Sequence, residues 1–203
     1  MHLVVGLGNP GREYEGNRHN VGFRIADQLA RPGTPWRSKH GAALAELDLG
    51  GEKVLLCKPM QFMNVSGQPV ASVAGFWKIP PARIVVAHDE LDLPFGRIKL
   101  GIGGGAGGHN GVRSLISSLG GPDFVRVRLG IGRPPPSWKG ADYVLSDFTR
   151  AEEAELPALV ATAVDAIREI VTRSLTSAMN KFNVKNQQNQ SNDKKDPKRG
   201  GDA

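Results

Sequence analysis

A histidine and an aspartate stand at positions where proteins often place catalytic groups. His19 follows a polar turn at the expected start of the first helix, and Asp89 follows the apolar strand segment 84–87. An imidazole can accept a proton near neutral pH, and a neighbouring carboxylate would orient its ring. The chain has no G-x-S-x-G sequence for a nucleophilic serine, so the pair favours activation of water over an acyl-enzyme. A helix-end hydrogen bond for His19 and a turn cap for Asp89 are the structural alternatives.

The segments that must position these groups alternate between strand and helix patterns. Short apolar runs predict strands at 2–5, 42–49, 53–57, 83–87, 97–100 and 125–129, and helical patterns cover 21–30, 70–77 and 112–119. Thr149 and Glu152 form a capping-box pattern that opens a last helix, whose apolar face extends to Met179. Pro157 predicts that this helix starts later or bends. The alternation predicts an α/β fold, in which one domain over residues 1–183 carries helices on both faces of its sheet.

Two glycine-rich loops raise the question of phosphate binding. Residues 6–11 carry G-x-G-x-x-G after the first strand, which matches the dinucleotide fingerprint of dehydrogenases. Gly16 and Gly22 interrupt the helix that would have to begin at those glycines, and Asp27 lies in a helical pattern instead of at a strand end. The dehydrogenase interpretation is therefore weakened. The loop 103–111 lacks the Lys-Ser/Thr ending of an ATP-binding P-loop, and its glycines allow either close approach to a ligand or a flexible connection.

The charge distribution favours a polyanionic partner. The net charge is +6, and residues 96–139 carry seven cations against one acid, Asp123. Such a surface attracts phosphates, which makes a nucleic acid a candidate partner. A solvated basic face without a ligand is the alternative, because RNA-specific aromatic motifs are absent.

Other features of the sequence exclude several classes of protein. No apolar stretch approaches the roughly 20 residues that a membrane-spanning helix needs, and the N-terminus has no secretory pattern, so we expect a cytoplasmic protein. The single cysteine, Cys57, lies in an apolar run and is expected to be a buried thiol. No Cys/His ligand spacing appears, so we predict neither a metal nor a cofactor. Residues 184–203 are predicted to be a disordered polar tail.

Taken together, six ordered blocks resemble bacterial peptidyl-tRNA hydrolase, over about residues 2–182. The resemblance implies a single α/β domain with a mixed twisted sheet, acting as a monomer on peptidyl-tRNA. The expected activity is hydrolysis of the ester that joins the peptide to the 3′-terminal ribose, which releases tRNA from prematurely released peptides. The matching blocks are Gly6-Leu7-Gly8-Asn9-Pro10-Gly11 with Tyr14, Arg18-His19-Asn20-Val21-Gly22, Lys58-Pro59, Phe62-Met63-Asn64-Val65-Ser66-Gly67, His88-Asp89-Glu90-Leu91-Asp92 and Gly107-Gly108-His109-Asn110-Gly111.

The family's residue roles transfer to matching positions. By resemblance, His19 is the catalytic base, Asp89 orients it, and Asn9 helps to distinguish blocked from free amino ends. The Asn9 amide is also a candidate donor to the oxyanion. The remaining family positions are substrate contacts at Tyr14, Phe62, Asn64 and Asn110, a cleft-lining Met63, and phosphate-binding cations at Lys99 and Arg128.

Two positions depart from the family pattern. Gly101 stands where the family commonly has a second cation, which predicts a weaker phosphate clamp, and Ala106 replaces a residue that is often polar. A tRNA-binding or ribosome-associated module without turnover is the alternative function, and the presence of both His19 and Asp89 counts against it.

Overall fold

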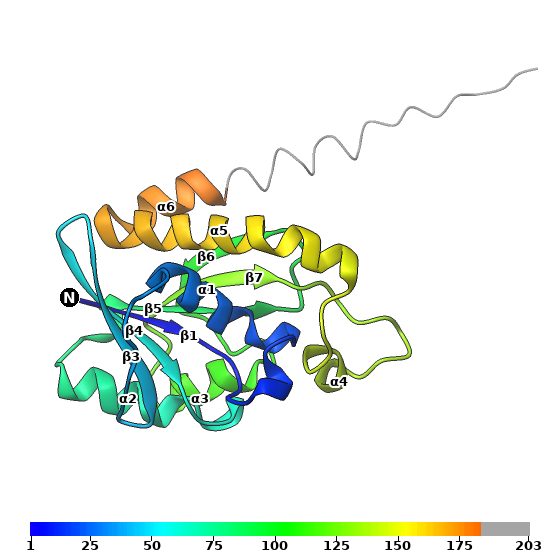
Figure 1. Cartoon of the computed structure of the whole chain (residues 1–203), viewed down its shortest axis with the longest axis horizontal. Helices are drawn as coiled ribbons and strands as arrows, with labels where there is room; N and C mark the ends of the chain where they lie inside the picture. Colours follow the sequence, from blue (N-terminus) through cyan, green and yellow to red (C-terminus); the bar gives the residue numbers. More distant parts are fainter. Residues whose placement is uncertain (184–203) are drawn as a thin grey trace, which may run out of the picture.

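Seven strands form one mixed sheet in the computed structural model, which describes residues 1–183 (Figure 1). The strand order is β2-β3-β4-β1-β5-β7-β6. The pairs β1/β4, β1/β5 and β5/β7 are parallel, and β2/β3, β3/β4 and β6/β7 are antiparallel. The strands are β1 His2–Gly6, β2 Arg37–Lys39, β3 Ala42–Leu49, β4 Glu52–Pro59, β5 Ile84–Glu90, β6 Ile98–Ile102 and β7 Val125–Gly130.

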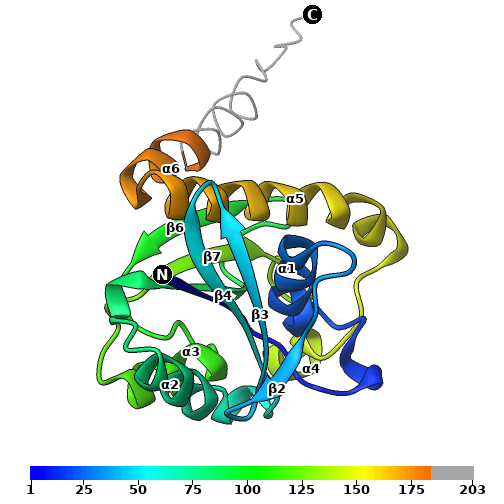
Figure 2. The same cartoon turned by 60° about the vertical axis from the view of Figure 1, so that its left-hand side comes forward.

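Helices cover both faces of this sheet, as the sequence predicts. Helices α1 (Val21–Ala30), α5 (Arg150–Thr172) and α6 (Leu175–Phe182) lie on one face, and α2 (Gly67–Phe76) and α3 (Asn110–Leu119) lie side by side on the other (Figures 1 and 2). The central strand β1 alternates between the two cores: Val4 packs in the α1/α5 cluster, and Leu3 and Val5 pack in the α2/α3 cluster. This burial on both faces explains the continuous apolar run at the N-terminus.

The last helical region differs from its prediction. It forms two helices, because α5 ends at Thr172 and Arg173 leaves the helical conformation at φ −127° and ψ −85°. Ser174 then caps α6 by accepting a hydrogen bond from the Ser177 amide. The capping box at Thr149 is present, and α5 begins at Arg150 with Pro157 inside it, so the expected later start is wrong.

Several short elements were not anticipated by the sequence patterns. Strand β2 has three exposed residues and so lacks the apolar alternation that predicts a strand. Helix α4 (Gly140–Val144) has only five residues, and a 3-10 turn, η2 (Arg18–Asn20), precedes α1. This turn separates the first helix from the glycines of the 6–11 loop, which removes the helix N-terminus that a dinucleotide site requires.

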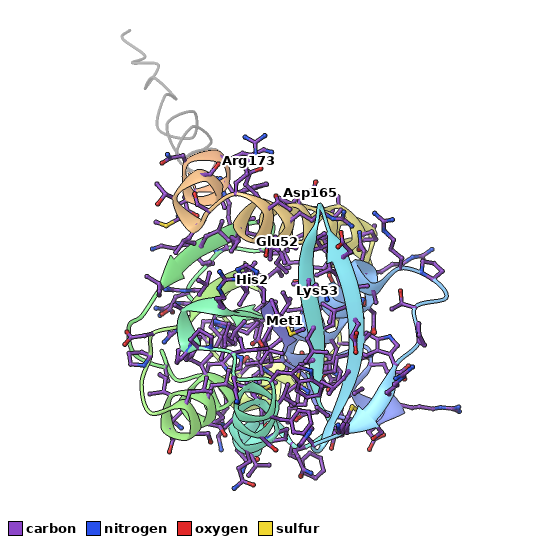
Figure 3. The ribbon with its side chains drawn as sticks, turned by 90° about the vertical axis from the view of Figure 1, so that its left-hand side faces the viewer. Met1, His2, Glu52, Lys53, Asp165 and Arg173 are labelled. Atoms are coloured by element: carbon purple, nitrogen blue, oxygen red, sulfur yellow. The ribbon has the colours of Figure 1, made fainter. Side chains whose placement is uncertain are left out.

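The carboxyl ends of the parallel strands β1, β4 and β5 meet at one end of the sheet. The loops that follow them carry Asn9, Met63 and the residues next to Asp89. Figure 3 looks at the opposite end, where the labelled Met1, His2, Glu52 and Lys53 mark the beginnings of β1 and β4. The fold therefore gathers the candidate catalytic loops at one end, as expected for an α/β sheet.

Three further predictions concern Cys57, membrane-spanning helices and residues 184–203. Cys57 is fully buried, and burial raises the pKa of its thiol to about 12, so it is a core residue and not a thiolate nucleophile. Within residues 1–183, no helix has the length and apolar character needed to cross a bilayer. The predicted tail at 184–203 lies outside the described residues.

Candidate active site

A buried carboxylate holds two imidazoles at the end of β5. Asp89 Oδ1 lies 2.8 Å from His19 Nδ1 and 3.0 Å from His109 Nε2. Asp89 is 2% exposed and His19 is 7% exposed. Burial alone would raise the pKa of Asp89, but the interactions with His19 and His109 outweigh it and hold that pKa well below its usual range. Asp89 is therefore a carboxylate that accepts from both rings.

The hydrogen bonds fix which ring nitrogen carries the proton. His109 is the N-cap of α3, and its Nδ1 accepts from the backbone amides of Gly111 and Val112 at 3.1 and 3.3 Å. Its proton is consequently on Nε2, which donates to Asp89. His19 donates to the same oxygen through Nδ1, which leaves Nε2 with a free lone pair. His19 lines a pocket of about 210 Å³, hereafter the His19 pocket, together with Asp89, Leu91 and Asn110. A general base with this tautomer can take a proton from water.

A third histidine supports the pair. His88 Nδ1 donates to the Asp89 carbonyl oxygen at 2.7 Å, and its ring packs edge-on against His109 with centroids 4.8 Å apart. Burial lowers the pKa of His88 to about 3, so the ring is neutral at physiological pH. It holds the β5 end and the His109 ring without adding charge beside Asp89.

The Asn9 side chain is fixed with its amide group free to donate. The Asn9 backbone amide donates to Asn20 Oδ1, and Asn20 Nδ2 donates to the Asn9 carbonyl oxygen, both at 2.9 Å. The Met63 amide donates to Asn9 Oδ1 at 2.8 Å, which identifies the oxygen side of the amide. Within residues 1–183, Asn9 Nδ2 has no hydrogen-bond partner, so it can donate to a ligand.

The same carboxylate and its two imidazoles also form a set of potential metal ligands. His19, Asp89 and His109 offer atoms that lie within 4.8 Å of one another, a cluster that sequence spacing did not reveal. Both imidazoles direct an N–H at the shared Asp89 oxygen, and this is the arrangement of a hydrogen-bonded base and its orienting groups.

Comparison with known proteins agrees with this geometry. The family model "Peptidyl-tRNA hydrolase" matches residues 3–192. The chain belongs to the peptidyl-tRNA hydrolase family. It is similar to the peptidyl-tRNA hydrolase of Frankia alni, with 51% identity over 89% of this chain and 93% of the relative. That of Nocardia farcinica is 50% identical over 89% of this chain and 95% of the relative.

The fold agrees with solved structures as well. The crystal structure of peptidyl-tRNA hydrolase from Acinetobacter baumannii superimposes with a TM-score of 0.85 and 38% identity, covering 90% of this chain and 94% of that chain. The predicted single α/β domain with a mixed sheet and the predicted family are both confirmed.

The other residues expected from the family pattern lie at different distances along the chain's surface, and Asn64 lines a separate groove with Asn110. Asn110 lines the His19 pocket, and Met63 is 5% exposed behind Asn9. Phe62 is 59% exposed and meets the Tyr14 ring edge-on, with centroids 6.3 Å apart. The exposed Phe62 ring and the partly buried Tyr14 ring thus flank the Asn9 loop, since Phe62 precedes Met63 and the Tyr14 amide donates to the Gly11 carbonyl oxygen.

The two expected phosphate contacts lie on the strands to one side of the catalytic pair, and Arg128 is the register partner of His88. Lys99 and Arg128 are opposite each other on β6 and β7. Because β7 and β6 are the first and second strands beyond β5, these cations stand to one side of Asp89. Arg126, also on β7, holds the glycine loop, because its guanidinium donates hydrogen bonds to the Gly104 and Gly105 carbonyl oxygens at 2.6 Å each.

Sequence reasoning did not assign roles to several residues of the site. His109 and His88 are in the motifs that carried the resemblance, but nothing in their spacing shows that they pack around Asp89. Arg18 is 4% exposed and donates to Ser146 Oγ at 2.8 Å and to Glu152 Oε2 at 2.7 Å. Its guanidinium also stacks on Tyr143 at 4.3 Å, so Arg18 ties the turn that carries His19 to α4 and to the start of α5.

Proposed function

We propose that this chain hydrolyses the ester bond between a peptide and the 3′-terminal ribose of tRNA. The observation that carries the proposal is the 2.8 Å contact between His19 Nδ1 and Asp89 Oδ1, which leaves Nε2 as the base in the His19 pocket. Membership of the peptidyl-tRNA hydrolase family supports the same substrate. The catalytic domain comprises residues 1–183.

The reaction follows from the protonation states of these groups. His19 Nε2 removes a proton from water while the water oxygen attacks the ester carbonyl carbon. Asp89 stabilises the imidazolium that forms and keeps its ring oriented. The Asn9 Nδ2 group and backbone amides donate to the oxyanion. The bond between the carbonyl carbon and the ribose oxygen then breaks, and the imidazolium returns its proton to that oxygen. The products are a free peptide and tRNA.

Recognition divides between the two parts of the substrate. Asn9 and Asn64 read the neutral amide of an N-blocked aminoacyl group, because side-chain amides both donate and accept without carrying charge. Tyr14, Phe62, Met63 and Asn110 complete the cleft around the ester. Lys99 and Arg128 bind tRNA phosphates, and the basic surface of the chain supports this assignment. The enzyme acts as a monomer in the cytoplasm.

One assay separates hydrolysis from binding alone. The protein is incubated with N-acetyl-aminoacyl-tRNA, and release of the N-acetyl amino acid is followed. Catalytic ester cleavage is expected. Tight, salt-dependent tRNA binding without any cleavage would instead identify a tRNA-binding module that has lost turnover.

A further inference from the structure

A polar groove adjoins the His19 pocket on the outer surface of α2 and α3. Its volume is about 340 Å³, within the roughly 300–1,000 Å³ range of small-molecule sites. We call it the α2–α3 groove. Its lining includes Asn64, Gln68, Asn110, Arg113, Ser117 and Ser118.

Asn110 connects the groove to the reaction centre. It lines both the groove and the His19 pocket. Arg113 Nη1 donates to Asn110 Oδ1 at 2.7 Å, so one guanidinium is held beside the junction of the two hollows. Arg113 is exposed, and the groove lining contains no carboxylate that would neutralise it. A ligand that continues from the reaction centre into the groove therefore meets an uncompensated positive charge.

The floor of the groove is set by close packing of the two helices. A Cβ at Gly67 would lie 2.1 Å from the Ser114 carbonyl oxygen, and the Gly67 amide donates to Ser114 Oγ at 2.9 Å. Only glycine fits at this contact, which holds α2 and α3 at a fixed separation. The groove is thus built on two helices of the fold and is preformed.

The position of the groove favours the peptide over the RNA. The ester has two substituents, and the expected phosphate contacts Lys99 and Arg128 lie on β6 and β7, on one side of β5. Helix α2 follows β4, which lies on the other side of β1 and β5. The α2–α3 groove is thus on the side of α3 that faces away from those cations.

The chemistry of the lining points the same way. Single-stranded RNA is usually bound by aromatic stacking together with several cations. The groove lining has no aromatic ring and only one cation. Hydroxyl and amide side chains instead match the alternating donors and acceptors of an extended peptide backbone.

We propose that the α2–α3 groove binds the peptide of the substrate upstream of the ester-linked residue, and that Arg113 gives it a preference for acidic side chains there. This inference rests on the proposed function. The residue that precedes the ester-linked one reaches Arg113, so an Asp at that place is attracted and a Lys is repelled. Both charges are at the surface, where single ion pairs are weak, and we expect a preference of about two- to tenfold in kcat/KM.

The test compares the cleavage of two substrates by three proteins. Values of kcat/KM are measured for acetyl-Asp-Ala-tRNA and acetyl-Lys-Ala-tRNA with wild type, Arg113→Gln and Lys53→Gln. Gln keeps a donor for Asn110 at position 113 while removing the charge. Lys53 is exposed at the beginning of β4, at the end of the molecule shown in Figure 3, so its variant controls for net charge.

The expected result is that wild type and Lys53→Gln share the preference for the Asp substrate and that Arg113→Gln loses it. An identical Asp-to-Lys ratio in all three proteins would overturn the proposal. If Arg113→Gln left that ratio unchanged but weakened binding of uncharged, deacylated tRNA, the groove would hold RNA instead. If wild type cleaved neither of these two substrates nor N-acetyl-alanyl-tRNA, the proposed function would be overturned and, with it, the role of the groove.

Discussion

The neutral state of His88 predicts a loss of stability in mild acid. Burial lowers the pKa of His88 to about 3, whereas an unfolded chain protonates histidine near pH 6.5. Between these two values the unfolded state binds a proton that the folded state does not. The free energy of unfolding therefore falls as the pH falls, by about 1.4 kcal/mol per pH unit, or about 2 kcal/mol at about pH 5.

His88→Asn isolates this contribution. Asn can keep a donor toward the Asp89 carbonyl oxygen, the group that His88 Nδ1 reaches at 2.7 Å, but it does not titrate. The smaller side chain costs stability at every pH, so the informative quantity is the change between two pH values. Urea unfolding at about pH 7 and about pH 5 gives each free energy by linear extrapolation.

Wild type is expected to lose about 2 kcal/mol more than His88→Asn over this interval. The variant retains a smaller pH dependence, because burial also lowers the pKa of His2. Asp89 does not contribute here, since the stability gained from its lowered pKa is lost only below the usual carboxyl range. Equal losses in both proteins would refute the assignment of a buried, neutral His88.

Three further predictions concern the site. In His109→Asn, Asn can still cap α3, but the Nε2 hydrogen bond to Asp89 is lost. Asp89 is then held less firmly beside His19, so turnover should fall about tenfold or more. Normal turnover in this variant would remove His109 from a positioning role. At Gly101 a Cβ would meet only Arg128 Nη2 at 3.6 Å, so a lysine should fit there. Gly101→Lys should steepen the log-log slope of tRNA affinity against salt by about 0.7 to 0.9, and Lys99→Ala and Arg128→Ala should flatten that slope. Unchanged slopes would place the phosphate contacts elsewhere. Wild type should prefer acetylated over free aminoacyl-tRNA by about tenfold or more in kcat/KM, and Asn9→Asp, which replaces the Nδ2 donor with an oxygen, should reduce that preference. A ratio that stays the same in Asn9→Asp and Asn9→Ala would exclude Asn9 from the discrimination.

The main elements were predictable because their burial leaves a local pattern. Strands β1 and β5 are buried on both faces and read as continuous apolar runs, and the capping box marks the start of α5 at a specific residue. Strand β2 and helix α4 are too short to show a period. The end of α5 was missed because an apolar face continues across Arg173 into α6, so only the backbone conformation there reveals the break.

The site was predictable only in part. His19 and Asp89 are 70 residues apart in the chain, and their pairing was implied by resemblance and not by spacing. The role of His109 depends on two simultaneous contacts, one to its own helix and one to Asp89. The second contact exists only once β5 and α3 are placed together, so no local pattern reports it. Arg18 is similar, because its partner Glu152 belongs to a helix 134 residues away.

The central claim is that His19 Nε2 is the base that activates water for ester cleavage. The most direct measurement compares wild type with His19→Ala in single-turnover cleavage of N-acetyl-aminoacyl-tRNA, with tRNA affinity measured in parallel. Loss of a positioned general base predicts a decrease of about 10² to 10⁴ in the cleavage rate. Affinity should be retained, because the expected phosphate contacts lie on β6 and β7. Cleavage by His19→Ala at the wild-type rate would contradict the account.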